Sequence, residues 1–260
     1  MDVGTVFTSN SKLPEQGQDR TRDNRRRLWP ALLTGIDHTL DLGWRGWLAL
    51  ALGLAAGWWL YVPLHELAHA LGCLATGGEV TRLEIAPAYG AAWLARWLPF
   101  VVVGSDYAGQ LTGFDTGGRD GVYLATVLAP YLLTLFPGVP ALLLCARRTG
   151  LAATAGFGAS LPWGLAPVLS LSGDYYEAGS ILASRAGAAL TDQGAFAVAI
   201  WRSDDLFRLV ADLAGRGALD CVNSAGIAAG LVLGIVLAVA TLWLGTAVFR
   251  AIAMAKPAKP

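Results

Sequence analysis

Two histidines and a glutamate in the first half of the chain have the spacing of a zinc site. His65 and His69 are four residues apart, and Glu66 is next to the first of them. On a helix, residues four apart share one face, so both imidazoles can reach one zinc ion. Glu66 can then serve as a base toward a water on the metal. The triplet therefore predicts hydrolysis by a zinc-activated water.

The helix that carries this triplet is expected to lie in a membrane. The apolar run of residues 44–62 leads directly to the motif, and polar side chains at the end of such a run are costly enough to imply a function. The 260 residues are 55% hydrophobic and 15% charged, whereas soluble domains carry about 25% charged residues. We therefore expect a polytopic α-helical membrane protein.

The expected fold has about four transmembrane helices and a small β-strand element after the HExxH helix. Each expected span has about the 20 residues that a bilayer requires. The strand element comprises residues 80–85 and 98–103, and a glycine-rich loop is expected over residues 109–121. The four expected spans are residues 44–70, 121–145, 151–171 and 222–249.

A single integral-membrane domain, residues 28–250, is expected between two cytoplasmic tails. Residues 1–27 are polar and basic, and no apolar segment directly follows their arginines. They predict a disordered tail rather than a cleaved signal peptide. Residues 251–260 predict a second, short tail. Residues 28–42 are mildly apolar but short, and predict a helix at the membrane interface.

Positive charges predict the orientation in the membrane. They cluster before the first span, between the second and third spans at Arg147 and Arg148, and after the fourth span from Arg250. With four spans these groups share one side, which the positive-inside rule assigns to the cytoplasm. Both termini are then cytoplasmic and the site lies toward the outer face. The expected location is a bacterial cytoplasmic membrane.

The same topology supplies a third metal ligand. Spans one and three run in the same direction, so Asp174, just after span three, reaches the same membrane face as His65 and His69. Two histidines, a carboxylate and a water make the open tetrahedral set of catalytic zinc. Glu177 is one helical turn further on and is an alternative ligand that the sequence leaves open.

The HExxH segment resembles the signature of the site-2 protease family, the intramembrane zinc metalloproteases. The likeness covers residues 65–85, where Gly77 ends the helix and a strand of alternating character follows. It implies a Zn²⁺-dependent endopeptidase that cleaves a membrane-embedded or membrane-proximal protein, with an Asp ligand near the end of a later span. At that point Asp174 follows Pro167, but Tyr175 stands where the family usually has glycine, and this segment contains no asparagine.

Two further segments predict contacts with other chains. The strand with Val80, Leu83 and Ile85 can offer an edge to which an unwound transmembrane substrate adds through main-chain hydrogen bonds. Span four has a face of small residues, suited to a partner or substrate helix or to packing on the chain's own core. This face consists of Gly226, Gly230 and Gly234.

Three other functions compete with a membrane zinc endopeptidase. A non-catalytic site-2 protease-like protein would bind a membrane partner and hold zinc structurally or not at all, but Glu66 would then have no use. A zinc peptidase of another membrane family would use Glu177 as a ligand. A transporter with a chance HExxH would often show repeated halves, and none is visible. The net charge of zero gives no reason to expect nucleic-acid binding.

Overall fold

The computed structural model describes residues 28–190 and 199–254. The described chain is mostly helical, with one sheet of three strands. Two helices are long and apolar enough to cross a membrane, α3 (Gly43–Ala75) and α13 (Cys221–Met254). A bent pair formed by α5 (Asp120–Leu128) and the helical segment Tyr131–Cys145 makes a third span if it is counted as one. The fold agrees with a helical membrane protein, but four spans are not shown.

The segments expected to be spans two and three are each broken. Within span two, Phe136 has extended backbone before Pro137, because proline disfavours the helical conformation of the residue that precedes it. The other break is at Leu165, between two prolines. The pieces are α5, α6 (Tyr131–Leu133), η2 (Thr134–Gly138) and α7 (Val139–Cys145), followed by α8 (Leu151–Gly164) and α9 (Ala166–Leu169).

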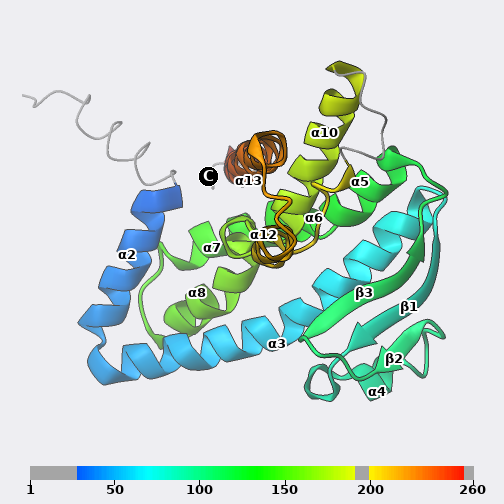
Figure 1. Cartoon of the computed structure of the whole chain (residues 1–260). Helices are drawn as coiled ribbons and strands as arrows, with labels where there is room; N and C mark the ends of the chain where they lie inside the picture. The colour runs from blue at the N-terminus through cyan, green and yellow to red at the C-terminus, as the bar shows by residue number, and fades with distance from the viewer. Residues whose placement is uncertain (1–27, 191–198, 255–260) are drawn as a thin grey trace, which may run out of the picture.

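Helices α3 and α8 lie side by side and run in the same direction (Figure 1). A Cβ atom at Gly53 would collide with the carbonyl of Ala155. Four residues further along, one at Gly57 would collide with the carbonyl of Ala159. Small residues let two backbones approach this closely. Residue numbers rise together along both helices, so spans one and three point the same way, as the sequence predicted.

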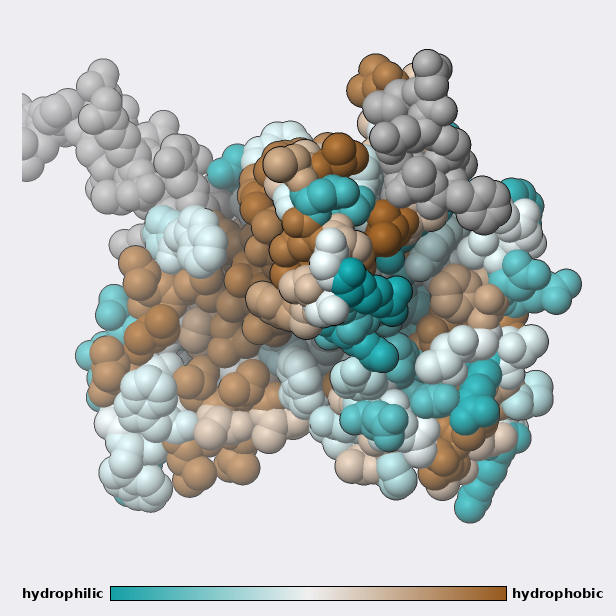
Figure 2. All heavy atoms as spheres, viewed as in Figure 1, coloured by the Kyte–Doolittle hydropathy of each residue, from teal (hydrophilic) through white to brown (hydrophobic). Residues whose placement is uncertain are grey.

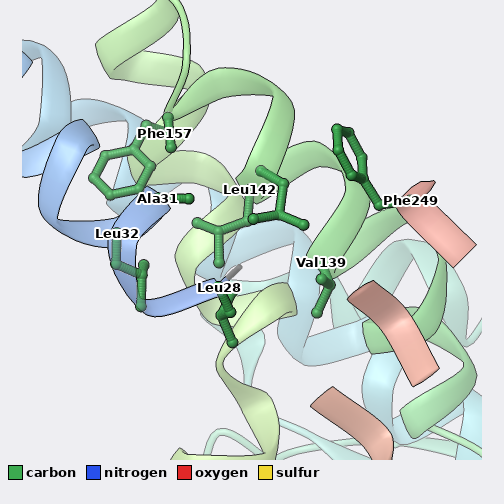
Figure 3. Close-up of a cluster of buried hydrophobic side chains, with 9 residues drawn as sticks. Leu28, Ala31, Leu32, Val139, Leu142, Phe157 and Phe249 are labelled. Atoms are coloured by element: carbon green, nitrogen blue, oxygen red, sulfur yellow. The ribbon is translucent and has the colours of Figure 1, made fainter. Parts of the chain in front are cut away.

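Helix α2 (Leu28–Asp41) forms the predicted helix before the first span. Its outer face keeps Trp29, Leu33 and Leu40 exposed, and its location at the membrane interface stays a prediction. In Figure 2 apolar residues gather over α2 and α13, whereas polar residues gather around α12 and the sheet. The inner face of α2 joins a buried cluster with α7, α8 and α13 (Figure 3), which includes Leu28, Ala31, Leu32, Val139, Leu142, Phe157 and Phe249.

The sheet has the strand order β2–β1–β3. β1 (Glu79–Ile85) pairs in parallel with β2 (Val101–Val103) and antiparallel with β3 (Gly109–Asp115). β1 and β2 agree with the predicted strand pieces, and η1 (Pro87–Tyr89) and α4 (Ala91–Leu94) connect them. The prediction of a glycine-rich loop over residues 109–121 is wrong for its first part, which forms the strand β3. A side chain at Gly113 would collide with Thr81 and Arg82 of β1, so this glycine serves a close strand contact.

The glycine face of α13 packs against the chain itself, the second of the two contacts that the sequence left open. A Cβ atom at Gly234 would collide with the carbonyl of Tyr175 in α10 (Asp174–Leu190), and one at Gly226 would collide with the ring of Trp201. Gly230 lies against Ser180 of α10. These contacts match the alternative of packing on the chain's own core.

Helix α13 continues to Met254, so the first four residues of the predicted second tail, 251–254, are helical. Residues 255–260 and the predicted first tail, residues 1–27, lie outside the described residues. Helix α12 (Leu206–Gly215) precedes α13, and its first turn is capped by the carboxylate of Asp205, which accepts the Arg208 backbone N–H.

Candidate metal centre

Three ligand atoms from two helices converge at one point. His65 and His69 lie one turn apart on α3, and Asp174 is the first residue of α10. The two histidine Nε2 atoms are 3.1 Å apart. The Asp174 Oδ2 atom lies 3.1 Å from Nε2 of His65 and 3.7 Å from Nε2 of His69. Both histidines are buried and Asp174 is half-buried, so the group could hold a metal ion.

The separations of these atoms suit a tetrahedral ion. Zinc bonds of about 2.0–2.1 Å place the ligand atoms of a regular tetrahedron about 3.3–3.4 Å apart. The separations of 3.1, 3.1 and 3.7 Å bracket that value. No fourth His, Cys or carboxylate joins the group within the described residues. Three protein ligands leave one tetrahedral position for water or substrate, the pattern of catalytic rather than structural zinc.

Two hydrogen bonds orient the histidines toward this point. His69 Nδ1 lies 2.9 Å from the carbonyl oxygen of Thr126 on α5. A carbonyl only accepts, so Nδ1 carries the proton and Nε2 keeps its lone pair for a metal. His65 Nδ1 lies 2.8 Å from the hydroxyl of Tyr61, which can accept the Nδ1 proton in the same way. Both rings are thus held in the orientation that a metal ligand requires, and the carbonyl also fixes the tautomer of His69.

The glycines of α3 bring α5 close enough for the first of these bonds. A Cβ atom at Gly72 would collide with the carbonyl of Ala125 and the side chain of Ala129. With hydrogen there instead, α5 passes against the last turns of α3, and the Thr126 carbonyl reaches His69. Figure 1 shows α5 and α10 gathered near the C-terminal half of α3.

Asp174 is fixed by two hydroxyl groups. Tyr131 of α6 and Ser170 each donate to Asp174 Oδ2 at 2.9 Å. Burial by itself would raise the pKa of Asp174 on α10, which is not one of the candidate spans. The neighbouring imidazoles, when either is protonated, and the hydrogen bond from Tyr131 instead hold this pKa well below its usual value. The carboxylate is therefore kept ionised, the form that binds a metal.

Glu66 lines a cavity of about 650 Å³ beside the ligands His69 and Asp174. One wall is residues 109–112 of β3, and another is the segment 202–205 before α12. Gly109 lies so close to Glu66 that a Cβ atom there would collide with the glutamate side chain. The strand that the sequence analysis missed therefore borders the predicted base.

Glu177, the alternative ligand, is not part of the convergent group. Its side chain is buried, lines the same cavity and accepts a hydrogen bond from the hydroxyl of Tyr123. Burial raises the pKa of Glu177 to about 8, although the bond from Tyr123 acts in the opposite direction. The geometry therefore favours Asp174 over Glu177 as the third ligand.

β1 does not offer the free edge that the sequence predicted at Leu83 and Ile85. It is the central strand, and its residues 83–85 pair with β2 on one side and with β3 on the other. Leu83 and Ile85 are fully buried in a cluster with Ala70, Ala91 and Val101, and Val80 packs against that cluster. The residues of the sheet that line the cavity come from β3.

The sequence predicted the convergence of His65, His69 and Asp174, but not the groups that orient these side chains. Tyr61 precedes His65 by four residues, and Ser170 precedes Asp174 by four. Tyr61 and His65 share a helix face on α3, so their spacing is a signal that could have identified Tyr61. Ser170 lies in the turn between α9 and α10, where helical spacing gives no such signal. Tyr131 and Thr126 lie far from their partners in the sequence, and no local pattern connects them.

Comparison with family models, with curated proteins and with solved structures finds no match to this chain. The resemblance to site-2 proteases therefore depends on residues 65–85 and on the convergence of His65, His69 and Asp174, and it stays an expectation.

Proposed function

We propose that this chain is an integral-membrane zinc endopeptidase of the site-2 protease type. It cleaves a membrane-embedded or membrane-proximal protein. The observation that carries the proposal is the convergence of the His65, His69 and Asp174 ligand atoms beside a cavity that Glu66 lines. A structural metal site has no use for a carboxylate in that position, so the arrangement favours catalysis over a non-catalytic role.

Each residue of the centre then has a defined role. His65, His69 and Asp174 hold the ion, with Tyr61 and the Thr126 carbonyl fixing the two imidazoles. A bound zinc ion would polarise the substrate carbonyl and lower the pKa of water to about 7. Glu66 accepts a proton from the attacking water and passes it to the leaving amine.

The outer edge of β3 is the place where the substrate backbone binds. Only β1 pairs with β3 among the described strands, so the other edge of β3 is available to an extended peptide. Residues 109–112 of that strand line the cavity next to Glu66. A transmembrane substrate must unwind before its peptide bonds are accessible, and an unpaired strand edge offers hydrogen bonds to the unwound segment. β3 replaces β1 in this role.

The site lies near one face of the membrane. His65 comes 22 residues after Gly43, the start of α3, which is about 33 Å along the helix. The hydrocarbon core is about 30 Å thick. With the positive clusters in the cytoplasm, both termini are cytoplasmic and the centre lies toward the outer face of a bacterial cytoplasmic membrane.

Substitution of Glu66 by glutamine tests the proposal. The amide cannot accept the proton of the water, whereas the three ligands are untouched. We expect Glu66→Gln to retain zinc and to accumulate an uncut membrane protein in the native cell. Glu79→Gln, at an exposed position of β1, is the matched control and should behave as wild type. Full processing in the Glu66 variant would remove this residue from the mechanism.

A further inference from the structure

We propose that Glu177 selects substrates with a lysine or arginine side chain next to the scissile bond. This inference rests on the proposed function and adds the substrate class. Glu177 is three residues after Asp174 on α10, so their Cβ atoms are about 5–6 Å apart. It lines the same cavity as Glu66 and His69. A side chain adjacent to the bond at the metal is therefore within reach of the Glu177 carboxylate.

Glu177 has no cationic partner in the described part of the chain. In that part of the chain the only hydrogen-bond donor to its carboxylate is the hydroxyl of Tyr123, a neutral group. The residue is 8% exposed. A buried carboxylate is costly unless charge or hydrogen bonds compensate for its lost hydration. A substrate ammonium or guanidinium group would supply the missing counter-ion.

The arginine on the cavity wall is already engaged elsewhere. Arg202 donates through both Nη atoms to Asp120, at 2.6 and 3.1 Å, and through Nε to Ser184 at 2.7 Å. It therefore does not neutralise Glu177. Arg208 also borders the cavity, but its residue is exposed to solvent, where a charge interacts only weakly.

Two further carboxylates on the wall reinforce this preference. Asp204 accepts the side-chain amide of Gln110 at 3.2 Å, and Asp205 accepts the backbone N–H of Arg208 at 3.0 Å. The amide is neutral, so Asp204 keeps its charge, but Asp204 is exposed and solvent weakens its interactions. Asp205 is half-buried and is stabilised by the N-terminus of α12, which it caps. Both aspartates line the cavity and add a smaller attraction for a cationic group than the buried Glu177 does.

The apolar part of the cavity explains why a long basic side chain fits better than a short polar one. Leu111, Phe114 and Val127 line the cavity together with Glu177. Lysine and arginine have apolar stems that pack on such surfaces while the charged end stays with polar groups. A cavity with apolar walls and a buried carboxylate suits this shape.

Binding of peptide hydroxamates tests the proposal without requiring turnover. Each compound has lysine, norleucine or glutamate as the residue next to the zinc-binding group. In one series this residue is on the amino side of that group, and in a second series it is on the carboxyl side. The zinc-loaded, detergent-solubilised chain is titrated at pH 8.5, above the pKa of Glu177. In one series the lysine compound should bind about 10- to 100-fold more tightly than norleucine, as a charge-assisted hydrogen bond provides. The glutamate compound should bind most weakly.

Glu177→Gln should reduce the lysine preference to about threefold or less and leave norleucine binding unchanged. Asp212→Asn, which removes an exposed carboxylate of α12, is the matched control and should keep the full preference. Equal binding of lysine and norleucine compounds in both series of the wild type would overturn this inference alone. If Glu177→Gln keeps the preference, the assignment to Glu177 is wrong. If no hydroxamate binds the zinc-loaded protein, the proposed function fails and the substrate class fails with it.

Discussion

Tyr61 should control the affinity of the site for zinc although it does not contact the metal. Its hydroxyl lies 2.8 Å from His65 Nδ1, and its ring packs edge-on against Trp163. Tyr61→Phe keeps the ring and removes only the hydroxyl. Loss of a partner that orients a ligating histidine typically weakens metal binding by about 10- to 100-fold. That range corresponds to about 1.4–2.7 kcal/mol of binding free energy.

Chelator competition in detergent measures this effect as a ratio of zinc dissociation constants. Tyr89→Phe is the matched control, because the Tyr89 hydroxyl bonds the exposed indole N–H of Trp58 at 3.1 Å, away from the ligands. We expect weaker zinc binding in the Tyr61 variant and wild-type binding in the Tyr89 variant. Zinc binding by the Tyr61 variant within about twofold of the wild type would show that the Tyr61 hydroxyl does not support the metal site. Equal losses in both variants would attribute the effect to general destabilisation.

Two other substitutions test the ligand set and the helix packing. Asp174→Ala should leave a weak, exchangeable zinc site, whereas Glu177→Ala should keep its zinc. Metal analysis after dialysis distinguishes the two variants. Loss of zinc from the Glu177 variant and not from the Asp174 variant would reverse the ligand assignment. Gly53→Ala places a methyl group against the carbonyl of Ala155 and should lower the free energy of unfolding by about 1–3 kcal/mol. Gly121→Ala, where nothing lies within 4 Å, should be neutral or stabilising by about 0.5–1 kcal/mol. Denaturant titration compares these two, and equal effects would contradict close packing at Gly53.

The sequence predicted the ligands because helical spacing and chain direction are both encoded locally. His65 and His69 share a helix face whatever the surrounding fold, and the direction of α8 follows from the number of chain reversals before it. Asp174 therefore arrives at the level of the histidines, as observed. The boundaries of the broken spans were not predictable to the same degree, since Pro137 could kink, break or end a helix.

The sheet was harder to predict because its third strand contains glycines at positions where neighbours leave no space. Gly109 and Gly113 read as loop residues in the sequence, but the side chains of Glu66 and Thr81 lie against them. Because β3 was not predicted, the sequence suggested β1 as the edge for the substrate. In the structure β1 is central, and we propose the edge of β3 instead. The sequence also could not predict which helix contacts the glycine face of α13. Tertiary packing places α10 against it.

X-ray absorption at the zinc edge identifies the ligands of the proposed metal centre. We expect one zinc ion per chain, with two imidazole nitrogens from His65 and His69 and two oxygens, one from Asp174 and one from water. All four should lie at about 2.0–2.2 Å. A sulfur atom in the first coordination sphere, only one imidazole, or no bound zinc after loading the purified protein would contradict this expectation.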